Sequence, residues 1–219
     1  MADLTGLGRI HIPDNRRMAY PMAAPEPIRA YRNHLLHGPV NDQGATPHCV
    51  AHSFEHLLRF LPIVNARKAG FEIDKLALYN AAQALDPWEG SAYDGTTVDA
   101  GAKALRAMGY ISGWTWAFDA ETVAAHVLEI GPVVVGTTWT MGMFAPDRDG
   151  YLHPDGPSVG GHAYTIKGAH LDKGCFYLTN SWGPEWCNGG HAKISFADMD
   201  ALLRDNGEAC APIEIDVEG

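Results

Sequence analysis

Four polar residues in this chain have the types and the order that a thiol hydrolase needs: Gln43, Cys49, His162 and Asn180. Attack on an amide carbonyl requires a thiolate, a base that generates it, a group that holds the base, and donors for the oxyanion that forms. Cys49 could be the nucleophile, His162 the base and Asn180 the group that holds the base. The side-chain amide of Gln43 and the backbone N–H of Cys49 could hold the oxyanion.

The sequence around these residues places them at the ends of regular elements. From Cys49 to Phe60 apolar residues recur at helical spacing, and Pro47 suits a helix start, so we expect Cys49 at a helix N-terminus. His162 opens a predicted strand, and Asn180 ends another one. A helix N-terminus and a neighbouring imidazolium would both lower the pKa of the Cys49 thiol below the roughly 8.5 of a free cysteine.

The elements expected along the rest of the chain divide it into a helical first half and a β second half. Helices are predicted over residues 74–84, 96–108, 119–130 and 197–205. β-branched and aromatic runs bounded by glycine predict strands at 133–139, 162–168, 175–179, 192–195 and 213–217. With the cysteine in the first half and the histidine in the second, we expect a cleft between them.

The composition argues against several classes of partner. The net charge is −10, from 26 acidic and 16 basic residues, whereas nucleic acid or an anionic membrane would need clustered lysine and arginine. The N-terminus has no basic region followed by an apolar run, and no window approaches roughly eighteen consecutive apolar residues. Four scattered cysteines indicate a reducing compartment, so we expect a cytoplasmic protein; a bridge among Cys175, Cys187 and Cys210 is the alternative.

With these residues in place, the sequence resembles the papain-like cysteine peptidases, the family of the plant papains and lysosomal cathepsins, from about Pro21 to the C-terminus. The resemblance rests on the Gln43–Cys49 spacing, on Gly161-His162-Ala163, on Asn180-Ser181-Trp182-Gly183 and on the glycine- and tryptophan-containing segment 183–190. It implies a cysteine-type endopeptidase in which Cys49, His162, Asn180 and Gln43 are catalytic. A peptide or protein substrate, no cofactor, no resident metal and a monomeric state are implied with it.

The same resemblance implies an α+β, two-lobed fold and a set of substrate-binding residues. We expect residues 1–20 to form an N-terminal extension or strap and residues 21–219 to form the peptidase domain. Its helical lobe would span about 45–130 and its antiparallel β-sheet lobe about 131–219, with the cleft between them. Segment 94–97 takes the place where family members pair with an extended substrate, so the implied substrate-binding residues are Gly95, Thr96, Gly161 and Trp182. Gly160 and Gly161 leave part of the pocket wall without side chains, which predicts tolerance of a bulky apolar substrate residue.

The sequence departs from the family pattern in two places. The usual Cys-Gly-Ser-Cys-Trp is here Thr46-Pro47-His48-Cys49-Val50, without the neighbouring half-cystine and the tryptophan. The sequence before Cys49 is too short for the family's folded inhibitory propeptide and resembles the leaders of bacterial and phage-type members. We therefore expect control of activity to come from elsewhere, and one hypothesis is that residues 1–20 lie across the cleft as a brake.

Three alternatives stand beside this interpretation. His52-Ser53-Phe54-Glu55-His56 fits the His-x-x-Glu-His pattern of a zinc metallopeptidase, whose third ligand would have to be a later residue such as Glu72, Glu89 or Glu121. A catalytically silent papain-like module could bind peptides or act as a scaffold. An acyltransferase could use the same cysteine and histidine, although transglutaminase-like enzymes usually hold the histidine with aspartate rather than with a residue such as Asn180.

Overall fold

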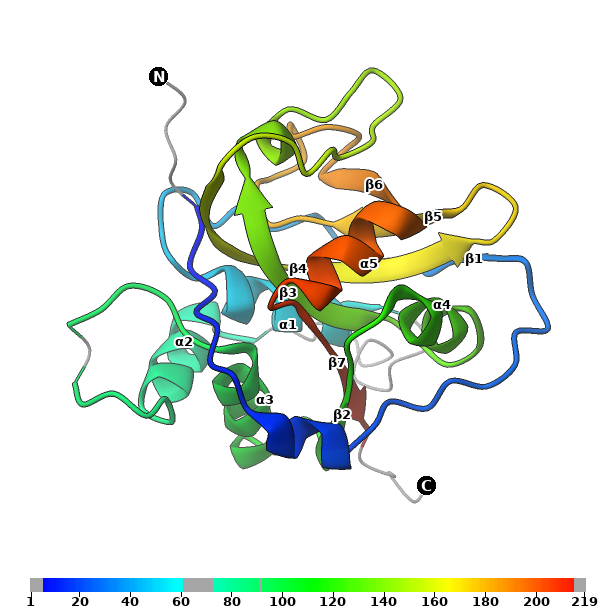
Figure 1. Cartoon of the computed structure of the whole chain (residues 1–219). Helices are drawn as coiled ribbons and strands as arrows, with labels where there is room; N and C mark the ends of the chain where they lie inside the picture. Colours follow the sequence, from blue (N-terminus) through cyan, green and yellow to red (C-terminus); the bar gives the residue numbers. More distant parts are fainter. Residues whose placement is uncertain (1–5, 61–72, 91, 215–219) are drawn as a thin grey trace.

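The computed structural model describes residues 6–60, 73–90 and 92–214 (Figure 1). Its α-helices are α1 (Cys49–Arg59), α2 (Lys75–Gln83), α3 (Val98–Ala107), α4 (Ala120–Glu129) and α5 (Phe196–Arg204), with 3-10 turns η1 (Asn15–Ala19) and η3 (Met141–Phe144). Its strands are β1 (Tyr31–Asn33), β2 (Gly113–Ala117), β3 (Val133–Thr140), β4 (Ser158–His170), β5 (Cys175–Thr179), β6 (His191–Ser195) and β7 (Glu208–Ile213). The predicted α+β class is confirmed.

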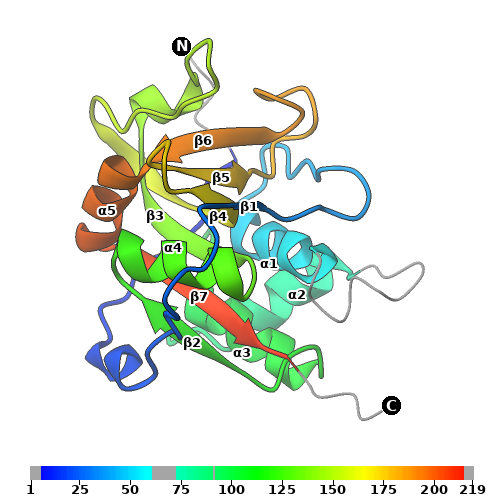
Figure 2. The same cartoon turned by 90° about the vertical axis from the view of Figure 1, so that its right-hand side faces the viewer.

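The strands form one antiparallel sheet in the order β2-β7-β3-β4-β5-β6, with β1 paired to β4. Figure 2 shows α1, α2 and α3 on one side of this sheet and α4 and α5 on the other. Four of the described α-helices begin where a side chain accepts hydrogen bonds from free backbone N–H groups, at Asp74, Thr97, Asp119 and Ser195. α1 is the exception, because its N-cap residue His48 makes no such bond.

Alternating residues of the central strands point into two hydrophobic cores. Val134 of β3 packs with α1, α2 and α3, whereas Val133 and Val135 pack with α4, α5 and the other strands. α4 lies within the range expected for the helical lobe, yet its apolar residues join the core on the other side of the sheet. The proposed division into residues 1–20 and 21–219 stays a prediction from the sequence.

Helix α1 is the centre of the first core, and all eleven of its residues are buried. The Thr165 hydroxyl on β4 donates a hydrogen bond of 2.9 Å to the Ser53 carbonyl. On the other side, Gly101 of α3 lies so close that an added Cβ would be 2.7 Å from both Phe54 and Val50. The missing side chain therefore lets α3 pack closely on the first turns of α1.

Three strands differ from the expectation. The strand predicted at 213–217 is β7, which begins at Glu208 and ends at Ile213, and residues 215–217 lie outside the described residues. Strands β1 and β2 were not predicted; β1 pairs with β4, and β2 contributes the edge of the sheet by pairing with β7. Strands β2 and β7 contain small residues such as Ala117, Ala209 and Ala211, which have low strand propensity and depend on their neighbours.

Substitution Gly101→Val should destabilise the fold, because its side chain would overlap Phe54 and Val50 in a packed core. We expect the free energy of unfolding to fall by about 1–3 kcal/mol, the usual cost of overpacking. Urea denaturation followed by circular dichroism would measure it. Ala107→Val, at an exposed position of the same helix, is the matched control, and equal effects of the two substitutions would contradict the packing argument.

Candidate active site

His162 and Asn180 are brought together by the pairing of β4 with β5. Thr165 of β4 lies opposite Thr179 of β5, so the residue after β5 reaches the first half of β4. There the His162 Nε2 and the Asn180 Oδ1 are 2.7 Å apart. Within the described part of the chain, the other ring nitrogen of His162, Nδ1, has no hydrogen-bond partner. Nδ1 is therefore the nitrogen left to exchange a proton.

Two tryptophans enclose the imidazole. The ring centroids of Trp182 and His162 are 5.0 Å apart. The ring centroids of Trp139 and His162 are 4.7 Å apart, and these two rings meet edge to face. His162 and Asn180 are both fully buried. A hydrogen bond shielded from water in this way holds the ring in one orientation.

Cys49 is the first residue of α1 and is fully buried. Its thiol receives backbone hydrogen bonds from Val50 and from Ala163, the residue after His162 on β4. The packing of α1 on β4 thus places the cysteine beside the strand that carries the histidine. The predicted helix start and the predicted strand meet at this point.

Gln43 is held against the Asn180 segment by its neighbour Ser181. The Gln43 backbone N–H donates to the Ser181 carbonyl at 2.8 Å, and the Ser181 hydroxyl donates to the Gln43 Oε1 at 2.5 Å. The Gln43 Nε2 donates to the Thr46 carbonyl at 2.7 Å. An amide nitrogen has two N–H groups, so one remains for another acceptor. Sequence reasoning did not assign this role to Ser181; the only signal for it was its place after Asn180.

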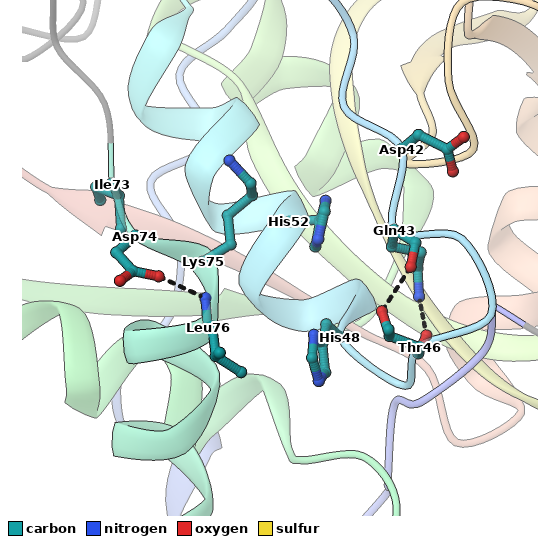
Figure 3. A pocket seen from close by; sticks show the side chains of 9 residues that line it. All are labelled: Asp42, Gln43, Thr46, His48, His52, Ile73, Asp74, Lys75 and Leu76. Carbon is teal, nitrogen blue, oxygen red and sulfur yellow. Dashed lines mark hydrogen bonds between the residues drawn. The ribbon is translucent and has the colours of Figure 1, made fainter.

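A cavity of about 740 Å³ lies next to Gln43. Figure 3 shows residues of the loop before α1 and of its first turns facing residues at the start of α2 across this cavity. Seven of its nine lining residues are polar or charged, and the full set is Asp42, Gln43, Thr46, His48, His52, Ile73, Asp74, Lys75 and Leu76.

The electrostatics of the site differ from the expectation. Complete burial raises the pKa of the Cys49 thiol to about 12, and it outweighs the backbone hydrogen bonds that favour the thiolate. Burial also lowers the pKa of His162 to about 4. The helix N-terminus was expected to lower the pKa of Cys49, but loss of water around the sulfur is the larger effect. Both groups are neutral at pH 7 in this structure.

All four expected substrate-binding residues contact residues 6–10 of the same chain. The backbone N–H groups of Gly8 and Arg9 both donate to the Gly161 carbonyl at 3.1 Å. The Thr96 N–H donates to the Gly8 carbonyl at 2.9 Å, and a Cβ on Gly95 would overlap that same carbonyl. The Trp182 Nε1 donates to the Gly6 carbonyl at 3.0 Å. The groups that were expected to bind a substrate peptide therefore already bind residues 6–10 of the same chain.

The His-x-x-Glu-His segment has a structural role instead. Glu55 pairs with Arg59 at 2.8 Å and accepts a hydrogen bond from the Asn41 side chain. The Nε2 of His56 accepts the Asn41 backbone N–H at 2.9 Å. Glu89 and Glu121 are exposed, and Glu72 lies outside the described residues. In the parts of the chain that the structure describes, no group of three possible ligands is arranged around a metal position.

None of the four cysteines is in a disulfide; Cys49, Cys175, Cys187 and Cys210 are all free. The alternative of a bridge among the last three is therefore not supported. Among the described residues, every helix is too short or too polar to span a bilayer.

Comparison with known proteins identifies the fold. No family model matches the chain. Xylellain, a cysteine protease from Xylella fastidiosa, superposes with a TM-score of 0.80 at 16% identity, covering 96% of this chain and 97% of xylellain. Digestive procathepsin L 3 from Tenebrio molitor larval midgut superposes with a TM-score of 0.68 at 17% identity, covering 97% of this chain and 77% of the procathepsin chain. The chain therefore has the papain-like fold, which confirms the resemblance seen in the sequence.

One curated relative gives a local match in sequence. Cathepsin B-like cysteine proteinase 5 from Caenorhabditis elegans is 33% identical over 76 residues. This segment spans 34% of this chain and 22% of the relative. Because so little of the relative is covered, its activity is carried to this chain only as a proposal.

The raised pKa of Cys49 predicts how its alkylation depends on pH. Below a thiol's pKa the thiolate fraction grows tenfold per pH unit, so the rate with iodoacetamide should rise without a plateau from about pH 7 to pH 10. Free cysteine, measured in parallel, should level off above its pKa of roughly 8.5. Mass spectrometry would assign the modification to Cys49. A plateau for Cys49 below pH 8 would show a lowered pKa and contradict the burial argument.

Proposed function

We propose that the chain is a cysteine-type endopeptidase that hydrolyses peptide bonds through Cys49, His162, Asn180 and Gln43. The observation that carries the proposal is the 2.7 Å contact between the His162 Nε2 and the Asn180 Oδ1, which leaves Nδ1 as the proton-exchanging nitrogen. The position of Cys49 at the start of a helix beside β4 supports it. The papain-like fold raises its plausibility by analogy.

In the proposed reaction, the His162 Nδ1 takes the proton of the Cys49 thiol, and the thiolate attacks the substrate carbonyl carbon. The oxyanion that forms accepts hydrogen bonds from the remaining Gln43 N–H and from the Cys49 backbone N–H. His162 then gives its proton to the leaving amine, and a thioester remains on Cys49. His162 removes a proton from water, which attacks the thioester and releases the acid and the free thiol.

Asn180 and Ser181 act on this reaction through other residues. Asn180 orients the imidazole and fixes which nitrogen carries the proton. Ser181 orients the Gln43 side-chain amide in two ways. The Ser181 carbonyl accepts a hydrogen bond from the Gln43 backbone N–H, and the Ser181 hydroxyl donates one to the Gln43 Oε1. Both are positioning residues, because neither would touch the substrate. The cytoplasmic location, the monomeric state and the absence of nucleic-acid partners stay predictions from the sequence.

A bulky apolar residue is the proposed preference at the pocket beside Gly160. In this structure the Leu7 side chain fills that place, with its Cδ1 2.9 Å from where a Cβ on Gly160 would lie. A fluorogenic peptide library should therefore show higher kcat/KM for leucine or phenylalanine than for glycine at one position. A strict preference for small residues there would argue against this pocket, and Gly160→Ala should reduce the advantage of the large residues.

Substitution Cys49→Ala should abolish hydrolysis of a fluorogenic peptide, with a loss of at least about 10³-fold, because no nucleophile remains. Asn180→Ala should cost less than about 10²-fold, since the base itself, worth roughly 10²–10⁴-fold, is retained. Cys187→Ala is the matched control, because that free thiol lies outside the site. Undiminished hydrolysis by pure Cys49→Ala protein would refute the assignment.

Labelling with E-64, an epoxide that alkylates papain-type thiolates, tests the site without turnover. A single adduct on Cys49 is expected, together with a metal-free protein. Stoichiometric zinc in the purified protein would instead favour a zinc metallopeptidase with His52 and His56 as ligands. An adduct without hydrolysis of any peptide would favour the silent module.

A further inference from the structure

We propose that the cavity beside Gln43 is a subsite for a carboxylate group of the substrate, and that Lys75 and the imidazole of His52 hold this carboxylate. The inference names a substrate class for the proposed peptidase, and it rests on that proposal for the role of Gln43. The cavity has a volume of about 740 Å³ and lies between the loop before α1, the first turns of α1 and the start of α2.

The cavity is next to the reacting groups because it shares residues with the loop that precedes Cys49. Gln43, whose remaining amide N–H is proposed to hold the oxyanion, lies in its wall. His48, the residue directly before Cys49, lies in the wall as well. A peptide whose carbonyl oxygen is bound by Gln43 therefore has neighbouring groups within reach of this cavity.

His52 is a buried imidazole that lines the cavity without a hydrogen-bond partner for its Nδ1 among the described residues. In Figure 3 its ring lies between Lys75 on one side and Gln43 on the other, and only 5% of the residue is exposed. Burial lowers the pKa of His52 to about 3, with smaller effects from the charges of Lys75 and His48. The ring is therefore neutral at pH 7 and has one N–H to donate. A ligand that accepts this hydrogen bond would satisfy a buried polar group.

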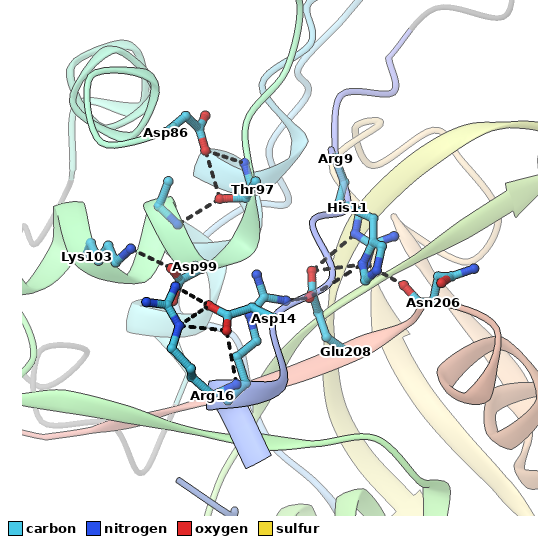
Figure 4. A network of polar contacts seen from close by, with 12 residues as sticks. Arg9, His11, Asp14, Arg16, Asp86, Thr97, Asp99, Lys103, Asn206 and Glu208 are labelled. Carbon is cyan, nitrogen blue, oxygen red and sulfur yellow. Dashed lines mark hydrogen bonds and ion pairs between the residues drawn. The ribbon is translucent and has the colours of Figure 1, made fainter. Parts of the chain in front are cut away.

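Lys75, the first residue of α2, supplies a positive charge close to His52. The distance is short enough for this charge to lower the pKa of the imidazole. Within the described part of the chain, Lys75 forms no ion pair. Several other basic residues do have carboxylate partners, as Figure 4 shows for Arg9 with Glu208 and for Lys103 with Asp99. The ammonium group of Lys75 is therefore available to an anionic ligand.

Two carboxylates also line the cavity, and backbone N–H groups engage both of them. The Asp74 Oδ1 accepts two backbone hydrogen bonds from the first turn of α2, at 3.0 and 3.1 Å. The Asp42 Oδ1 accepts the Gly44 N–H at 2.8 Å. Both aspartates are exposed, so water and salt screen their charges. The less exposed groups, His52 and Lys75, can both donate hydrogen bonds, and a carboxylate accepts from both.

Binding can be measured without turnover in Cys49→Ala protein. Succinate, a dicarboxylate probe, should shift the NMR signals of the His52 ring, which are assigned by their loss in His52→Gln. Succinamide, the neutral amide of the same shape, should leave these signals in place. Adding Lys75→Met should weaken succinate binding about fivefold, the upper range for a partly exposed ion pair. Lys103→Met is the matched control, because that lysine is on α3 and pairs with Asp99.

Hydrolysis of matched peptides identifies the source of the carboxylate. Fluorogenic peptides would carry glutamate or glutamine at each position in turn, with either a free or an amidated C-terminus. We expect kcat/KM about fivefold higher for the acid than for its amide at one place in the peptide. An advantage for glutamate assigns the subsite to a side chain, whereas an advantage for the free C-terminus assigns it to the end of the substrate. Either advantage should disappear in Lys75→Met and persist in Lys103→Met.

The two measurements distinguish failure of this inference from failure of the proposed function. Succinate binding that depends on Lys75, without hydrolysis of any peptide, would support the subsite and count against the peptidase. Hydrolysis with equal rates for acids and amides, together with no shift of the His52 signals, would overturn the subsite and leave the peptidase standing. Succinate binding of equal strength in Lys75→Met, with folding confirmed by circular dichroism, would overturn it too.

Discussion

The burial of α1 between the sheet and two other helices is the constraint on which the site depends. Because α1 packs on β4, its first residue, Cys49, lies beside Ala163 and hence beside the strand of His162. No side chain caps this helix, so tertiary packing alone fixes its N-terminus. The same packing withdraws the thiol from water, and desolvation then controls its pKa. Position and reactivity of the nucleophile thus have one common cause.

The helices could be predicted from the sequence because their signals are local. Apolar spacing and capping residues such as Asp74 and Asp119 placed α2 and α4 within one or two residues. The strands β2 and β7 could not, since their alanines have little strand preference of their own and pair only because β3 is already in place. The packing of α4 on the sheet also depends on long-range contacts that no local pattern encodes.

For the candidate site, the sequence identified the residue types but not their environment. The four residues proposed as catalytic were found because their order and neighbours form a known pattern, and the structure brings His162 and Asn180 into contact. The raised pKa of Cys49 was missed because the water is excluded partly by residues 6–9, far away in the chain. The pairing of Arg9 with Glu208 across 199 residues had no signal in either segment alone.

The alternation of side chains along β3 has a consequence for how the molecule unfolds. Val134 belongs to one hydrophobic core, and its neighbours Val133 and Val135 belong to the other. Neither core can lose its packing while β3 keeps its place in the sheet, so the two halves share their stability instead of each having its own. The protein is therefore expected to melt in a single cooperative transition, with equal calorimetric and van't Hoff enthalpies.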